Sequence, residues 1–173
     1  MKKIILLAAV AIFSLTSAVA QQKFGHVNSQ KLLDTLPSRK AAIEQLKVFE
    51  AQGYKELQEM DEDLNKSYAA YEKNKPTMSP VIQKIEEEKL MKKQQALQER
   101  EQGLQGEMQA ISQELNNPIL EIVKKAVEIV ADRKKLSYVI DESTTLYFKG
   151  GTDITNEVVI ELLKLDAEAT LKK

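Results

Sequence analysis

The stretch KNKPTMSP, residues 73–80, separates two long polar segments that contain no other proline. Proline has no amide hydrogen to donate and interrupts helices, although Pro80 can also serve as the first residue of a new helix. The segments on the two sides, 38–74 and 80–116, are each 37 residues long. Two equal segments joined by a short turn predict an antiparallel helical hairpin whose tip is formed by residues 73–80.

The first segment carries apolar and small residues at steps of three or four, from Ile43 to Tyr71, with a mean spacing of 3.5 residues. This spacing is the coiled-coil period. In the second segment the stripe begins at Ile82, becomes irregular through the run EEEKLMKKQQA and resumes at Leu97. Each helix would be about 55 Å long at about 1.5 Å per residue. Because such a hairpin has a narrow seam and no globular core, we expect one face of it to stay accessible.

A second interruption, Asn116-Asn117-Pro118, predicts that the returning helix ends at residue 116. A further helix would then start at Pro118, with Asn117 as its cap. Beyond it, Gly150-Gly151 offers a turn that tolerates positive φ, and Thr155 can cap a last helix. The apolar face of that last helix includes Val158, Val159, Leu162 and Leu163.

Strand-like runs occur only near the two ends of the chain, at residues 23–27, 136–140 and 144–149. The sequence therefore predicts an α+β fold. A small β-rich body would comprise residues 21–37 and 117–173, and a helical hairpin arm would comprise residues 38–116. Because a three-stranded sheet that carries such an arm is marginal alone, we expect copies of the same chain to cover its edges and its apolar face.

The first twenty residues, MKKIILLAAVAIFSLTSAVA, have the pattern of a cleavable signal peptide, with two lysines, an apolar run and a small-residue cleavage site. A retained membrane anchor is less favoured, because the run is shorter than the roughly 20 residues that a spanning helix needs. The mature protein would begin at Gln21 and lie outside the cytoplasm. Its 23 basic and 26 acidic residues do not indicate a nucleic-acid partner. The sequence has no cysteine, which excludes disulfides and thiolate chemistry.

Three features together resemble the Skp/OmpH family of periplasmic chaperones: FGHVNSQKLLDTLP (24–37), the hairpin of charged helices, and LSYVIDESTTLYFKGGTDITNEVVIELLK (136–164). The resemblance implies a homotrimer with a small β-rich body and three helical arms around a cavity. It also implies an ATP-independent holdase that keeps unfolded outer-membrane proteins soluble in the periplasm. Consistent with this, the six glycines form no phosphate-binding loop.

An unfolded outer-membrane protein suits such an arm, because its strands alternate apolar and polar residues and offer many weak contact points. A discontinuous apolar stripe can contact several of these points at once, so that avidity replaces a single deep pocket. The candidate client-binding residues are Leu57, Met60, Leu64, Tyr68, Tyr71, Leu97, Leu104 and Met108.

Three glycines fall near one level of the predicted arm. If Asn74 pairs with Pro80, Gly53 lies opposite residue 101, close to Gly103 and Gly106. Each glycine inside a helix costs about 0.8–1 kcal/mol relative to alanine, so a hinge in the middle of the arm is one hypothesis. Close packing of the two helices at small residues is an equally good alternative.

The tip carries the lysines Lys73, Lys75 and Lys84. A solvated turn is the simpler interpretation of these charges, and a weak contact with anionic lipid is the alternative. Some members of the family are strongly basic, and their affinity for lipopolysaccharide and anionic lipid is understood through that charge. This mature chain is slightly acidic, which weakens the case for lipid binding more than the case for client binding.

Candidate residues for catalysis or metal binding are few. His26 is the only histidine, and we expect it to be a packed or surface residue rather than a ligand. Asp141 and Glu142 follow a predicted strand, but no nucleophile accompanies them, and a turn with Ser143 is the simpler account. We therefore expect no enzyme activity, metal or cofactor. The alternative to the holdase is an oligomeric coiled-coil spacer or adaptor of the cell envelope, which would grip one folded partner.

Overall fold

The computed structural model describes residues 23–171, so the predicted signal peptide lies outside the described residues. The chain divides into two compact units. The sheet unit comprises the described residues up to Leu36 together with those from Ile122 onward, and the hairpin unit comprises Pro37–Glu121. No helix within residues 23–171 has the length and the apolar character needed to cross a membrane.

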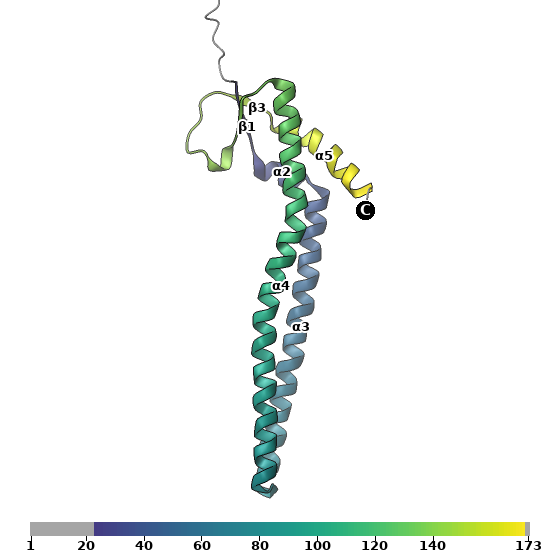
Figure 1. Ribbon diagram of the computed structural model, residues 1–173, viewed down its shortest axis with the longest axis vertical. Coiled ribbons are helices and arrows are strands. Elements are labelled where there is room, and N and C mark those ends of the chain that lie inside the picture. The colour runs from purple at the N-terminus through teal and green to yellow at the C-terminus, as the bar shows by residue number, and fades with distance from the viewer. Residues whose placement is uncertain (1–22, 172–173) are drawn as a thin grey trace, which may run out of the picture. The chain divides into compact units, whose positions relative to one another are not determined.

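Two long helices and a short turn make up the hairpin unit. They are α3 (Pro37–Asn74), the 3₁₀ helix η1 (Lys75–Thr77) and the part of α4 (Pro80–Lys134) that precedes Ile122. Figure 1 shows α3 and α4 side by side. They run antiparallel, because the ion pairs between them join Asp63 to Lys93 and, further from the turn, Glu56 to Arg100.

The turn between the helices forms around the two prolines. Lys75 and Pro76 begin η1 directly after α3, and the Thr77 hydroxyl donates a hydrogen bond of 2.9 Å to the Asn74 carbonyl. On the other side, the Ser79 hydroxyl accepts from the amide of Ile82 in the first turn of α4. Side-chain oxygens thus satisfy backbone groups that the helix ends leave without partners.

The seam of the hairpin near the turn is a cluster of apolar side chains. Leu64, Tyr71 and Leu90 are buried, with 5–7% of their surface exposed, and Met78 and Leu97 pack against them. The Tyr71 hydroxyl donates a hydrogen bond of 2.5 Å to Glu87 across the seam. This cluster joins the two helices on their facing sides, as the 3.5-residue spacing leads one to expect.

The contacts across the hairpin are shifted by two or three residues from the expected register. Gly53 lies against Leu104, not opposite residue 101. The expected register assumed that Asn74 and Pro80 lie at the same level.

The predicted helix break at Asn116-Asn117-Pro118 is wrong, because α4 continues through Pro118 to Lys134. Proline in a helix interior removes one hydrogen bond and disturbs the preceding turn. Ile119, Ala126 and Val130, on the same helix beyond the proline, are buried. Burial of this apolar face outweighs the local effect of one proline, since most helical stability in proteins comes from packing.

The sheet unit contains three short parallel strands in the order β2-β1-β3. They are β1 (Phe24–Val27), β2 (Tyr138–Asp141) and β3 (Thr152–Asp153). The register pairs His26 with Ile140 on one side and with Asp153 on the other. Segments from the two ends of the chain thus meet on β1, and the α+β class predicted from the sequence is confirmed.

The third strand is not the one that was predicted. Residues 144–149 do not form a strand, and Thr152–Asp153 takes the third place in the sheet. The hydroxyls of Thr144 and Thr145 both donate to the Asp141 carbonyl, which closes the 3₁₀ helix η2 (Glu142–Thr144). The threonines that favour a strand by composition are therefore used in a turn.

Helices α2 (Ser29–Thr35) and α5 (Thr155–Leu171) complete the sheet unit. Its largest fully buried side chains are Leu32, Leu36, Val130, Ile154, Val158 and Leu162. Of the predicted apolar face of α5, Val158 and Leu162 are buried, whereas Leu163 is 40% exposed. Gly150 and Gly151 have positive φ values of 122° and 95°, as expected for the turn before β3.

Thr155 does not act as the predicted cap. It is the first residue of α5, and its hydroxyl accepts from the amide of Asn28, 3.1 Å away. The cap function falls to its neighbours, because Asp153 Oδ1 accepts from the Thr155 amide at 2.8 Å and the Ile154 carbonyl accepts from Val158.

Candidate functional site

Exposed apolar side chains lie on both helices of the hairpin unit. Tyr54 on α3 is 57% exposed and Met91 on α4 is 66% exposed. Exposed large apolar side chains on a soluble protein can offer contact points to a partner. The exposed large apolar residues of this unit are Ile43, Val48, Tyr54, Tyr68, Val81, Ile82, Ile85, Met91 and Leu120. We refer to this set as the arm surface.

The residues singled out from the sequence for client binding divide into three groups. Leu64, Tyr71 and Leu104 are buried in the seam, with 7%, 6% and 2% of their surface exposed. These three hold the hairpin together and do not offer a surface to a partner. Of the others, Tyr68 is exposed, and Leu57, Met60, Leu97 and Met108 are partly buried.

Sequence reasoning missed most of the arm surface. It followed the positions that repeat every 3.5 residues, and three of the residues it chose there, Leu64, Tyr71 and Leu104, lie in the seam between the helices. Tyr54, Val48 and Met91 fall outside that repeat and are exposed. A search for large apolar residues off the repeat would have found them.

The three glycines of the proposed hinge have different surroundings. A Cβ atom at Gly53 would lie 2.3 Å from Leu104 Cδ1, so Gly53 permits close packing of the helices. Gly106 has open space where a Cβ atom would point, and a Cβ atom at Gly103 would meet only the end of Arg100, 3.9 Å away. The packing alternative therefore accounts for Gly53, and the hinge hypothesis rests on Gly103 and Gly106.

The lysines of the tip, Lys73, Lys75 and Lys84, are all exposed. Lys75 Nζ lies 5.2 Å from the centre of the Tyr71 ring and 3.9 Å from a carboxylate oxygen of Glu72. The hydrogen bond to Glu87, with desolvation and the Glu87 charge adding to it, raises the pKa of Tyr71 to about 12. Tyr71 is thus neutral at any physiological pH and stays a hydrogen-bond donor.

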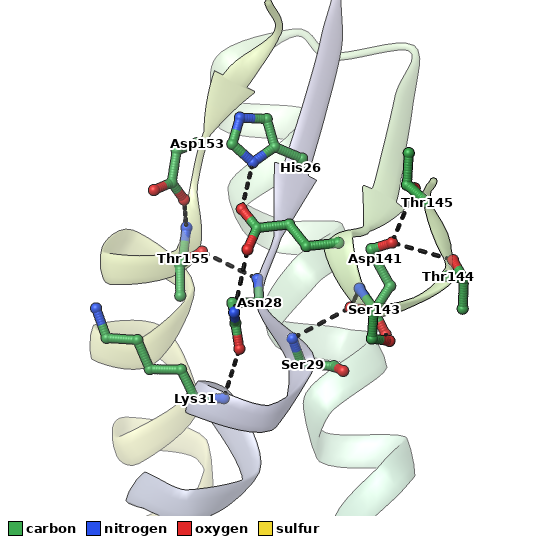
Figure 2. A network of polar contacts seen from close by, with 11 residues as sticks. His26, Asn28, Ser29, Lys31, Asp141, Ser143, Thr144, Thr145, Asp153 and Thr155 are labelled. Carbon is green, nitrogen blue, oxygen red and sulfur yellow. Dashed lines mark hydrogen bonds and ion pairs between the residues drawn. The ribbon is translucent and has the colours of Figure 1, made fainter. Parts of the chain in front are cut away.

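A network of polar contacts connects the strands of the sheet unit (Figure 2). His26 Nδ1 lies 2.7 Å from Glu142 Oε1, and the second oxygen of Glu142 accepts from Asn28 Nδ2 at 3.1 Å. Asn28 also caps α2, because its side-chain oxygen accepts from the Lys31 amide at 2.9 Å. The network fixes the end of β1 against the turn that follows β2.

Asp141 forms the turn with Ser143 that was predicted from the sequence. Its two carboxylate oxygens accept from the Ser143 amide at 3.1 Å and from the Ser143 hydroxyl at 2.7 Å. Desolvation acts to raise the pKa of Asp141, but hydrogen bonds from Ser29 and Ser143 outweigh it and lower the pKa. Hydrogen bonds from Thr155 likewise lower the pKa of Asp153.

The sheet unit has exposed aromatic and aliphatic side chains around its strands. Phe24 and Tyr138 stack with ring centres 5.4 Å apart, and the rings of His26 and Phe148 are 4.8 Å apart. Next to them lies a cavity of about 300 Å³, lined by residues of β1, β2 and the segment 142–151. The exposed large apolar residues of this unit are Phe24, Tyr138, Ile140, Leu146, Tyr147, Phe148, Ile160, Leu163 and Leu171.

The fold defines the class of this protein. It has a small parallel sheet, joined in sequence to a long helical hairpin with exposed apolar side chains. The family model for "Outer membrane protein (OmpH-like)" matches residues 23–162 of the sequence. The chain therefore belongs to the OmpH-like family, and the resemblance first seen in its terminal segments is confirmed.

The fold is similar to that of a solved structure. It is the crystal structure of a candidate outer membrane chaperone (OmpH-like) from Caulobacter crescentus CB15. The two share 22% sequence identity with a TM-score of 0.73, and the match covers 87% of this chain and 88% of that one. At this identity the likeness establishes the fold. No curated protein matches the sequence.

Proposed function

We propose that this protein is an ATP-independent holdase that binds unfolded outer-membrane proteins in the periplasm and keeps them soluble for delivery to the outer membrane. Membership of the OmpH-like family supports a role in outer-membrane biogenesis, and the similar protein from Caulobacter is itself a candidate chaperone. The signal-peptide pattern of residues 1–20 supports the location.

The observation that carries the proposal is the arm surface. Its apolar residues are set among charged ones along both helices, with Tyr54 at 57% and Met91 at 66% exposure. An unfolded β-barrel protein presents an apolar side chain at every second residue of each strand. Many weak contacts along the arm hold such a chain by avidity, and the client leaves when it folds into the membrane.

Self-association of the sheet unit is the second part of the proposal. Parallel sheets are normally covered on both faces, and exposed strand edges invite pairing. Here β2 and β3 are both edge strands, and Phe24, Tyr138 and Tyr147 are exposed beside them. We propose that copies of the chain cover these surfaces, with the homotrimer implied by the Skp/OmpH resemblance as the expected assembly.

The test uses the mature chain from Gln21. A urea-unfolded outer-membrane β-barrel protein is diluted into buffer with and without the chain, without ATP, and aggregation is followed by light scattering. The mass of the chaperone is measured separately by chromatography with multi-angle scattering. We expect a three-chain mass and suppression of aggregation near one trimer per client. If the chain forms a stable oligomer but does not suppress aggregation, the holdase function is wrong and the adaptor function is favoured.

A further inference from the structure

Three side chains with metal-ligand chemistry converge in the sheet unit. His26 lies on β1, Glu142 follows β2, and Asp153 lies on β3. One ligand atom from each of the three lies within 4.8 Å of the other two. The carboxylates come more than a hundred residues after the histidine, so no spacing in the sequence marks this group.

The sheet register explains why these side chains meet. His26 and Asp153 are paired residues on neighbouring parallel strands, and such residues project to the same face of a sheet. Figure 2 shows Asp153 beside the His26 ring. Glu142 reaches the same place from the turn after β2 and lies 2.7 Å from His26 Nδ1. Each ligand therefore stands on a different segment of the sheet unit.

The carboxylates are held in place by further contacts. Glu142 Oε2 accepts from Asn28 Nδ2 at 3.1 Å, and Asp153 Oδ1 accepts from the Thr155 amide at 2.8 Å. Hydrogen bonds of this kind orient metal-binding carboxylates in known sites. His26 and Glu142 also line the 300 Å³ cavity, which gives room for the water molecules that complete a coordination shell.

We propose that His26, Glu142 and Asp153 bind a divalent transition-metal ion of the zinc type. One imidazole nitrogen and two carboxylate oxygens are ligands that Zn²⁺ uses, with bonds of about 2.0–2.2 Å. Ligand atoms around a tetrahedral zinc ion lie about 3.3 Å apart. Zinc binding would therefore separate His26 Nδ1 and Glu142 Oε1, now 2.7 Å apart, and bring together those ligand atoms that now lie up to 4.8 Å apart. The imidazole ligand favours zinc over Mg²⁺ and Ca²⁺, which prefer oxygen. The bound ion would join β1, η2 and β3.

The test uses the mature chain freed of metal, with ZnCl₂ as the probe. His26 is the only histidine, so its imidazole signals in the NMR spectrum report on this site alone. We expect these signals to shift on titration with one Zn²⁺ per chain and to be unaffected by Mg²⁺. We also expect zinc to raise the unfolding temperature, because the ion binds only the folded arrangement of the three segments.

Two conservative variants separate ligation from folding. Asp153→Asn keeps an oxygen that can accept from the Thr155 amide. Glu142→Gln keeps a side-chain oxygen that can lie against His26 Nδ1. Each should weaken the affinity for zinc at least about tenfold, because loss of a hydrogen-bond partner of a metal ligand alone typically costs about that much. Asp132→Asn, at an exposed carboxylate of the same unit, is the matched control and should bind like the wild type.

Zinc binding that is equal in the wild type and in both ligand variants would overturn the proposal. So would His26 signals that do not move at millimolar Zn²⁺. Circular dichroism of every variant checks that the fold is intact, so that a loss of binding reports on the ligands.

Discussion

Gly53 of α3 packs so closely against Leu104 of α4 that a Cβ atom at position 53 would lie 2.3 Å from Leu104 Cδ1. Leu104 is 2% exposed, so its side chain has little room to move away. The close approach of the two helices at this level depends on the missing side chain. This pair therefore fixes the register of the hairpin at a point far from the turn.

Replacement of Gly53 by alanine should destabilise the hairpin unit, because overpacking of a filled seam typically costs about 1–3 kcal/mol. Thermal unfolding followed by circular dichroism measures the effect. Gly106→Ala is the matched control, since a Cβ atom there meets nothing within 4 Å. That variant should be stabilised by about 0.8–1 kcal/mol. Equal effects of the two substitutions would contradict the packing role of Gly53.

The hinge hypothesis makes a separate prediction for Gly103 and Gly106. If these two glycines give the middle of the arm its flexibility, replacing both by alanine should slow amide hydrogen exchange around residues 100–108. It should also narrow the range of client sizes that the protein keeps soluble. Unchanged exchange and an unchanged client range in this double variant would leave the glycines without a hinge role.

Acid should destabilise the sheet unit through Asp141 and Asp153. Hydrogen bonds lower the pKa of both carboxyls below the ordinary value of 3.8, so their ionised forms favour the folded state. This contribution is fully present above that value and is lost as the pH falls through the lower pKa of the folded state. In urea unfolding at a series of pH values, the Asp141→Asn, Asp153→Asn double variant should lose less stability below about pH 4 than the wild type. If the stability of both proteins falls equally with pH, Asp141 and Asp153 are not the source of the loss of stability in acid.

Contact of the tip with anionic lipid stays a prediction. Lys73, Lys75 and Lys84 are exposed, and clustered lysines attract anionic membranes by about 1 kcal/mol each near the surface. Replacing all three by glutamine should weaken sedimentation with anionic vesicles at low salt and leave neutral vesicles unaffected. If the variant and the wild type bind anionic vesicles equally, the tip lysines do not mediate contact with lipid.

The sequence predicted the long helices well because their signals are local. Two prolines mark the turn, and the 3.5-residue spacing marks the seam from Leu64 to Tyr71. The same local signals failed at Pro118, where burial of Ile119, Ala126 and Val130 keeps the helix intact. A proline indicates a weak point in a helix, and tertiary packing decides whether the helix ends there.

The sheet and the sites depend on contacts between distant residues, which a single sequence does not reveal. The segment from Thr144 to Lys149 has the composition of a strand, yet its first threonines close a turn on Asp141. Aspartate is uncommon in strands, yet Thr152 and Asp153 pair with β1 across the fold. The grouping of Glu142 and Asp153 around His26 follows from that pairing, and so it escaped sequence reasoning.

We propose the arm surface as the place where clients bind. The decisive measurement compares the wild type with a variant in which Tyr54, Tyr68 and Met91 are replaced by serine, in the scattering assay with an unfolded β-barrel protein. A control variant carries serine at three exposed polar positions, Gln52, Gln94 and Gln98. We predict that the first variant needs several times more protein to suppress aggregation, while the control matches the wild type and all three keep the same oligomeric mass. Equal suppression by both variants would contradict the account.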